Sequence, residues 1–321
     1  MPSPVMPTLA LSTSWNAFRH TDGHAMLREI ADLGFSHAEL SHGTRVSLVP
    51  GIDRAIRDGV IRISSIHAFC PLPPGINRSA PNLFEPSAKD PAERKLWLRY
   101  AEQTLEYAAK LGATVAVFHL GSCSRRWFDP GFRLERQAEK RDRSSLEEDQ
   151  RFCKIREKAL EKLRRNAEEP WKRVLESISQ VAPRAASLGV RMGLENREGV
   201  SELPLEDHWN SLWTEKKVSE ICGYWHDTGH ARIKKQLGLL DEDERLTALA
   251  PNWIGCHLHD TDIAGQDHLP LGDGTIDFEA LSHRWTTGHL LTLEFGPRVT
   301  QEAVVRSHQR LRALVSARNL G

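Results

Sequence analysis

The chain has 321 residues, enough for one large domain or two ordinary ones, and a hydrophobic share of 40% with nine tryptophans indicates a globular protein with a substantial core. Its 43 Lys and Arg balance 43 Asp and Glu, so no overall charge attracts a nucleic acid or an anionic membrane. The five cysteines are far apart and form no CxxC pair, which argues against a disulfide framework and against a thiolate zinc site.

The sequence shows no targeting or membrane-spanning segment. The N-terminal stretch MPSPVMPTLALSTSW lacks a basic region followed by a long apolar run, as a signal peptide would have. No apolar stretch approaches the roughly 20 residues that a membrane helix needs. We therefore expect a soluble protein of the reducing cytoplasm, with no membrane and no nucleic-acid partner. A homo-oligomer is compatible with the sequence, which leaves the oligomeric state open.

Short apolar runs alternate with longer amphipathic segments along the chain, a pattern typical of βα units. The first amphipathic segment, GHAMLREIADLGF, ends at a Leu-Gly pair, and Trp97, Ala101, Thr104 and Ala108 recur at helical spacing before Gly112. The predicted strands are Leu9–Trp15, His37–Leu40, Ile61–His67, Thr114–His119, Val190–Glu195, Ile221–Asp227, Trp253–His257 and Leu290–Glu294.

Eight strands that each precede a helix predict an α/β fold of the (β/α)₈ TIM-barrel type, formed by residues 1–321 as a single domain. A doubly wound open sheet is the competing fold. It would need a phosphate-binding loop at its switch point, and no GxGxxG motif follows the first strand.

A charged segment, residues 124–169, interrupts this pattern between strands four and five. It holds 14 Lys or Arg and 11 Asp or Glu in 46 residues, with the two signs mixed. This composition predicts a solvated helical insertion with ion pairs between neighbouring turns. The other interpretation is a lid or partner surface over the barrel mouth, with Arg125, Arg126 and Trp127 nearest to the mouth.

Six of the predicted strands end on a group that can bind a metal or transfer a proton. These groups are His67, His119, Glu195, Asp227, His257 and Glu294. Each alone has an ordinary explanation; Asp227, for example, could simply cap the helix that follows it. In a parallel barrel, however, all the carboxyl ends of the strands meet at one face, and buried carboxylates are costly unless they are paired or bind a metal.

Two glutamates, an aspartate and a histidine form an oxygen-rich set that suits Mn²⁺, Mg²⁺ or Zn²⁺. His259, two residues beyond His257, is expected to contact the substrate or to support the metal ligands, and Asp260 to support a ligand or a substrate hydroxyl. The Pro- and Gly-rich loop 68–86 could form a wall of the pocket or be an ordinary surface loop.

The motifs GLEN, HDTGH, HLHD followed by DHLPLGDGTIDF, and LEFG resemble those of the xylose isomerase-like TIM-barrel superfamily. That superfamily includes sugar phosphate isomerases and epimerases and endonuclease IV. The resemblance covers nearly the whole chain except the charged insertion. It implies that Glu195, Asp227, His257 and Glu294 hold one divalent metal ion, with Mn²⁺ expected first and Mg²⁺, Zn²⁺ or Co²⁺ as alternatives.

The resemblance also assigns further histidines. His230 matches a residue that faces substrate in the epimerases and holds another metal in the endonuclease. His67 and His119 match two residues that hold a metal there, which leaves a second metal at His67 and His119 open. His268 matches another endonuclease ligand, but the endonuclease pattern Asp-x-His is broken, because Gln266 stands where the aspartate belongs and Asp267 adjoins the histidine.

The leading hypothesis is a metal-dependent isomerase or epimerase of a ketose or keto-sugar, acting through an enediolate. Glu195 and Glu294 would be the catalytic pair, one removing a proton α to the carbonyl and the other returning it. His230, His67, His119, His259 and His268 are the predicted substrate-binding residues.

Three other functions remain open. A keto-sugar dehydratase or keto-glycoside lyase would use the same site and expel a leaving group. An endonuclease IV-like phosphodiesterase would need two or three metals. A non-catalytic sugar-binding barrel would not need two opposed glutamates.

Overall fold

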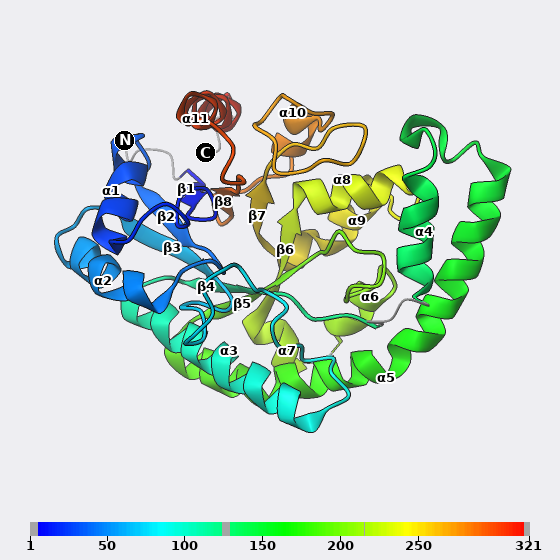
Figure 1. The fold of residues 1–321 in the computed structure, drawn as a ribbon, viewed down its shortest axis with the longest axis horizontal. Coiled ribbons are helices and arrows are strands. Elements are labelled where there is room, and N and C mark those ends of the chain that lie inside the picture. The colour runs from blue at the N-terminus through cyan, green and yellow to red at the C-terminus, as the bar shows by residue number, and fades with distance from the viewer. Residues whose placement is uncertain (1–5, 124–128, 215, 318–321) are drawn as a thin grey trace.

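The computed structural model describes residues 6–123, 129–214 and 216–317, and it forms a closed barrel of parallel strands in the order β1 to β8 (Figure 1). The barrel closes where β1 pairs with β8, with Thr8 opposite Leu290. The strands are β1 (Thr8–Ser12), β2 (His37–Leu40), β3 (Arg62–His67), β4 (Val115–Phe118), β5 (Arg191–Glu195), β6 (Cys222–Asp227), β7 (Trp253–Leu258) and β8 (Leu290–Leu293).

Helices and short 3₁₀ turns connect the strands around the outside of the barrel (Figure 1). They are α1 (Gly23–Asp32), η1 (Val46–Leu48), α2 (Val49–Arg57), α3 (Pro91–Leu111), α4 (Pro130–Ala138), η2 (Arg143–Ser145), α5 (Gln150–Leu188), α6 (His208–Leu212), α7 (Lys216–Ile221), α8 (Thr228–Gln236), α9 (Glu242–Leu249), η3 (Ala250–Asn252), α10 (Phe278–Ser282) and α11 (Gln301–Ser316). None of the described helices is both long and apolar enough to cross a membrane.

The predicted TIM barrel is confirmed, and all eight predicted strands are present with shifts of a few residues at their ends. The largest difference is at β1, which ends at Ser12 because the backbone turns there and Ala17 N–H bonds back to the carbonyl of Thr13. The predicted helix around Trp97 is α3; Asp90 caps its start, and Gly112 ends it with a left-handed φ of 75°.

The interior of the barrel is filled by a small apolar cluster around Trp225, which also includes Val115, Val117 and Ile254. The indole ring of Trp225 occupies the space beside two glycines that lie in the strands. A Cβ atom added to Gly193 would lie 3.2 Å from the ring, and one added to Gly255 only 2.3 Å from it. Trp225 also contacts the ring of His257 edge-on, with 5.2 Å between ring centroids. The cluster therefore forms the floor beneath the strand ends.

The charged insertion between β4 and β5 is helical, as predicted, and consists of α4, η2 and the first half of α5. The expected boundary at residue 169 lies inside α5, a single helix of 39 residues that Asp149 caps at its start and Gly189 at its end. The insertion and the barrel helix that precedes β5 are therefore one continuous helix. Arg125, Arg126 and Trp127, expected nearest to the mouth, lie outside the described residues.

The described part of the insertion packs beside the loops that follow β5 and β7. Glu135 of α4 accepts a hydrogen bond of 2.7 Å from the backbone N–H of Val200, and Ser201 donates one to Asp129. The guanidinium of Arg143 lies against Gly265. The insertion thus borders the mouth on the side of α8, as Figure 1 shows.

Candidate active site

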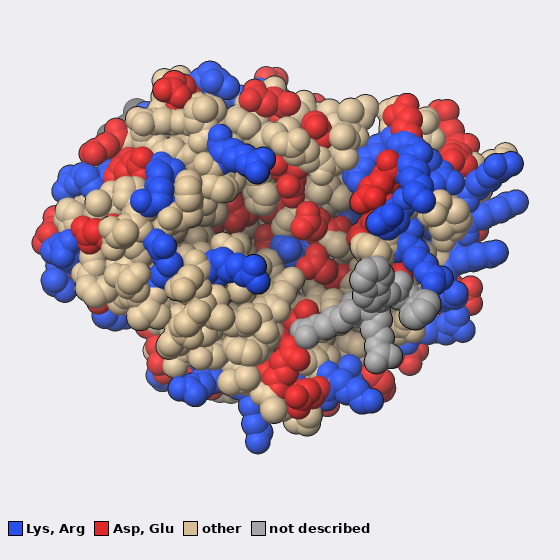
Figure 2. All heavy atoms as spheres, in the orientation of Figure 1, with Lys and Arg blue, Asp and Glu red and all other residues tan. Residues whose placement is uncertain are grey.

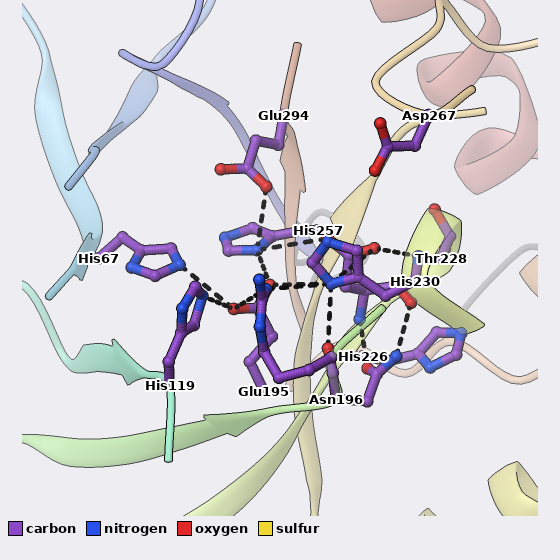
Figure 3. Close-up of polar contacts among 12 residues, drawn as sticks. His67, His119, Glu195, Asn196, His226, Thr228, His230, His257, Asp267 and Glu294 are labelled. Carbon is purple, nitrogen blue, oxygen red and sulfur yellow. Dashed lines mark hydrogen bonds and ion pairs between the residues drawn. The ribbon is translucent and has the colours of Figure 1, made fainter. Parts of the chain in front are cut away.

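The strand ends bring the predicted site residues together at one face of the barrel (Figure 3). His67, Glu195 and Asp227 are the last residues of β3, β5 and β6, and His257 is the penultimate residue of β7. His119 and Glu294 directly follow β4 and β8. Figure 2 shows Asp and Glu side chains gathered in the hollow at the centre of this face.

The four predicted metal ligands each offer a donor atom within 4.8 Å of the others. His257 is central: its Nδ1 lies 2.8 Å from Glu195 Oε1, 3.3 Å from Glu294 Oε2 and 3.9 Å from Asp227 Oδ2. Glu195, Asp227 and His257 are fully buried, and Glu294 is 4% exposed. Three carboxylates in so dry a place repel one another unless a cation lies among them, so this donor set fits a divalent metal ion.

The same charges act on His257 itself. Burial alone would lower the pKa of this imidazole, but the carboxylates of Glu294, Glu39 and Glu195 raise it well above its ordinary value. Without another cation, the His257 imidazolium therefore partly neutralises the cluster. Its Nδ1–H donates to Glu195, and its Nε2–H donates to the carboxylate of Glu39.

Glu39 is a site residue that the sequence did not reveal. It lies on β2, is fully buried, and accepts from His257 Nε2 with distances of 3.0 and 3.1 Å to its two oxygens. Ser65 of β3 donates a further hydrogen bond of 2.8 Å to it. One feature of the sequence could have indicated it: a charged residue stands inside the short strand HAEL, one position before the strand ends.

Asp227 acts both as a helix cap and as a member of the cluster. Its Oδ1 accepts from the backbone N–H of His230 at the start of α8, at 2.8 Å. Its Oδ2 accepts from His259 Nε2 at 3.0 Å. Burial would lower the pKa of His259, but the carboxylate of Asp227 raises it to about 9.

His67 and His119 converge on the other oxygen of Glu195. Their Nε2 atoms lie 3.2 and 2.7 Å from Glu195 Oε2. Burial and the guanidinium of Arg197 lower the pKa of His119 to about 3, so its ring is neutral. Its Nδ1 lies 2.9 Å from Oδ1 of Asn82, which lies in loop 68–86; this loop therefore does contribute to the site.

His230, His259 and His268 form a second group of imidazoles, with ligand atoms within 4.8 Å of one another. Burial lowers the pKa of His230 to about 4, helped by Arg197 and opposed by Asp227. The ring of His268 stacks on that of His259 at 4.2 Å, and its backbone has the left-handed φ of 54° that non-glycine residues rarely adopt. This backbone turn lets the His268 N–H donate to His259 Nδ1.

The segment that follows Glu195 adds two residues that the sequence did not suggest. Arg197 is buried and contacts Glu195, Glu202 and His230 at 3.5, 3.4 and 3.2 Å. Glu198 faces Asp267, and burial together with that carboxylate raises the pKa of Glu198 to about 7. The motif GLENREG contains both residues, but only the folded loop shows that they turn inward.

Asp260 anchors the loop over the mouth. Its buried carboxylate accepts from the backbone N–H groups of Thr261, Gly272 and Ile276 at 2.9, 2.9 and 3.0 Å. It therefore holds in place the loop that carries Asp267 and His268, rather than contacting a metal ligand in the described residues.

Several solved structures share this fold at low sequence identity. A D-tagatose 3-epimerase-like protein is 19% identical, with a TM-score of 0.65 and coverage of 97% of this chain and 98% of that one. A 3-keto-D-glucoside 4-epimerase from E. coli is 16% identical, with a TM-score of 0.65 and coverage of 96% and 99%. A D-psicose 3-epimerase from Clostridium cellulolyticum H10, solved with D-tagatose, is 12% identical, with a TM-score of 0.63 and coverage of 96% and 99%.

A search of curated protein sequences found no match to this chain. The profile of the family described as "Xylose isomerase-like TIM barrel", by contrast, matches residues 27–310, which is most of the chain. Together with the closed eight-stranded barrel, this match shows that the chain belongs to the xylose isomerase-like TIM-barrel family.

Proposed function

We propose that this protein is a metal-dependent epimerase or isomerase of a ketose or keto-sugar, with Glu195 and Glu294 as its catalytic pair. The observation that carries the proposal is their placement: the carboxylates of Glu195, at the end of β5, and of Glu294, directly after β8, lie 2.8 and 3.3 Å from one atom, His257 Nδ1. The names of the structural neighbours, two of them sugar 3-epimerases or epimerase-like and one a keto-glucoside epimerase, support the same chemistry.

Glu195, Asp227, His257 and Glu294 would hold the metal, with Mn²⁺ expected first and Mg²⁺, Zn²⁺ or Co²⁺ as alternatives. When bound, such an ion supplies Lewis acidity that favours loss of the proton α to the substrate carbonyl. The residues of the chain then transfer the proton. One glutamate removes it and leaves an enediolate, and the other returns a proton to the opposite face.

The histidines around the glutamates would orient the sugar. His67 and His119 contact Glu195, while His230 and His259 contact Asp227 and are grouped with His268, which lies in the loop that Asp260 anchors. Neutral imidazoles such as His119 and His230 can accept hydrogen bonds from hydroxyl groups. The acidic hollow suits a neutral polyol better than a polyanion, in line with the balanced net charge.

Solvent deuterium incorporation tests the proposal directly. The protein with Mn²⁺ in D₂O should introduce deuterium next to the carbonyl of at least one sugar in a panel of ketoses and keto-sugars. Glu195→Gln and Glu294→Gln should each abolish this exchange while the circular dichroism spectrum is kept. Glu302→Gln, on the exposed side of α11, is the matched control and should exchange normally. Full exchange in the Glu294→Gln variant would contradict the proposed pair.

One observation favours a second candidate, a phosphodiesterase with two or more metals. His67 and His119 both direct Nε2 toward Glu195 Oε2, an arrangement that could hold a further cation. Metal analysis of the purified protein separates the candidates, since one ion per chain supports sugar chemistry and three support phosphodiester cleavage. Mass spectrometry of the product separates isomerisation, which keeps the substrate mass, from elimination, which does not.

A further inference from the structure

Glu39 on β2 places its carboxylate against the imidazole of His257, on the side opposite the metal-facing Nδ1. Both Glu39 and His257 are fully buried. The two oxygens of Glu39 lie 3.0 and 3.1 Å from His257 Nε2, so the carboxylate meets the ring nitrogen almost symmetrically. Ser65 donates to Oε2 at 2.8 Å and holds the carboxylate in this orientation.

An ionised carboxylate only accepts hydrogen bonds, so Glu39 requires a proton on His257 Nε2. A neutral imidazole carries one proton, and the other nitrogen is then bare. A metal ion at the cluster would take the place of the proton that His257 Nδ1 otherwise donates to Glu195. The bare nitrogen of His257 is then Nδ1, the atom that faces Glu195, Glu294 and Asp227. In the opposite tautomer, Nδ1–H would point into the cluster, and Nε2 would carry no proton to donate to Glu39.

We infer that Glu39 is a positioning residue that fixes the tautomer and the ring orientation of His257, so that Nδ1 is free to bind a divalent metal. The inference rests on the proposed function, because it concerns the metal site of that function. Histidines that bind metals commonly donate their second N–H to a carboxylate, and loss of that partner typically weakens metal binding about 10- to 100-fold. Glu39 meets these requirements in its burial, its distance and its supporting serine.

Three variants separate this role from a general contribution to folding. Glu39→Met removes the acceptor and fills the space. Glu39→Gln keeps an acceptor, because its carbonyl oxygen can accept from His257 while its NH₂ group donates to Ser65. Glu85→Gln is the matched control: Glu85 is also a buried carboxylate that accepts from serines, here Ser87 and Ser122.

The experiment measures the Zn²⁺ dissociation constant of each protein by competition with a chelator, after circular dichroism has shown that each is folded. Glu39→Met should bind Zn²⁺ about 10- to 100-fold more weakly than the wild type. Glu39→Gln should lose less than Glu39→Met, and Glu85→Gln should bind like the wild type. In the Zn²⁺-loaded wild type, ¹⁵N spectra of the imidazoles should show His257 protonated at Nε2, assigned by its absence from His257→Gln.

The outcomes separate this inference from the proposed function. Wild-type affinity in Glu39→Met would overturn the role of Glu39 and leave the epimerase proposal standing. A His257 protonated at Nδ1 in the Zn²⁺-loaded protein would overturn the role of Glu39 and would also remove His257 from the proposed ligands, while leaving the catalytic pair to be tested by exchange. A wild-type protein that binds no divalent ion would overturn both. An equal loss in Glu39→Met and Glu85→Gln would show a general effect of removing buried charge and would also overturn the inference.

Discussion

The glycine at position 255 should be far less replaceable than the glycine at position 193, although both lie in barrel strands beside the same tryptophan. In Gly255→Ala the new methyl group would lie 2.3 Å from Trp225 Cζ3 and 2.8 Å from the backbone oxygen of Leu290. Ordinary carbon contacts lie at about 3.5–4.0 Å, so the overlap with the ring exceeds 1 Å by this measure. Neither neighbour can move away easily, because Trp225 is fully buried and the carbonyl belongs to β8.

The magnitude follows from this overlap. Overpacking a rigid core costs about 1–3 kcal/mol, and Gly255→Ala should reach about 3 kcal/mol because one of its clashes is with backbone. In Gly193→Ala the nearest atoms are side-chain carbons at 3.2 Å, which can shift by a few tenths of an ångström. The lower entropy of the unfolded alanine chain returns about 0.4–1 kcal/mol, so this variant should lose less than about 1 kcal/mol.

Urea unfolding followed by circular dichroism measures both variants, and a double-mutant cycle tests the cause. Trp225→Phe removes the part of the ring that the new methyl group meets. In its background, Gly255→Ala should cost at least about 1 kcal/mol less than in the wild type. Equal losses for the two alanine variants, or purely additive effects of Gly255→Ala and Trp225→Phe, would refute the packing argument.

Three further predictions address pH, the loop and the metal. Burial lowers the pKa of His289 to about 4, so the folded protein keeps its full stability from this group above about pH 6.5 and loses it as the pH falls from 6.5 to 4. In urea titrations at several pH values, the free energy of unfolding of His289→Asn should therefore fall less than that of the wild type across this window, by at most about 3 kcal/mol. Asp260→Ala should lower the free energy of unfolding by about 2–3 kcal/mol because it removes the buried carboxylate that accepts from three backbone N–H groups, of which that of Thr261 is buried and those of Gly272 and Ile276 are partly buried. A loss under 1 kcal/mol in urea would contradict this. Mn²⁺ at about 100 times its dissociation constant should stabilise the wild type by about 2.7 kcal/mol, whereas Glu294→Gln at the same Mn²⁺ concentration should show a smaller rise in melting temperature, and an equal rise would argue against Glu294 as a ligand.

The strands were predictable because each is buried on both faces and therefore reads as a short apolar run between amphipathic segments. The strand ends were predictable for the same reason, since the parallel barrel brings His67, Glu195 and Asp227 to one face whatever the loops do. Sequence alone thus predicted the fold and the neighbourhood of the site, though binding of a metal by these residues stays a prediction.

Other parts of the site depend on contacts that no local pattern encodes. Glu39 reaches His257 only because closure of the barrel through β1 and β8 brings β2 and β7 to one interior. Asn82 reaches His119 because loop 68–86 folds over the mouth. Arg197 turns inward where it pairs with Glu202 of the same loop, and the separation of these two residues matches no helix or strand pattern that the sequence would reveal. Such pairings follow from closure of the barrel and from loop packing, so they become visible only in the structure.

The length of α5 also has a consequence for the order of folding. Helices α4 and α5 are neighbours in sequence and pack together, so their contacts require little loop closure. The contact between β1 and β8, by contrast, joins Thr8 to Leu290 across nearly the whole chain. Because local contacts generally form before distant ones, we expect the α4–α5 hairpin to form early and the β1–β8 seam to close last. Pulse-labelling hydrogen exchange should then show protected amides in α5 before protection appears in β1.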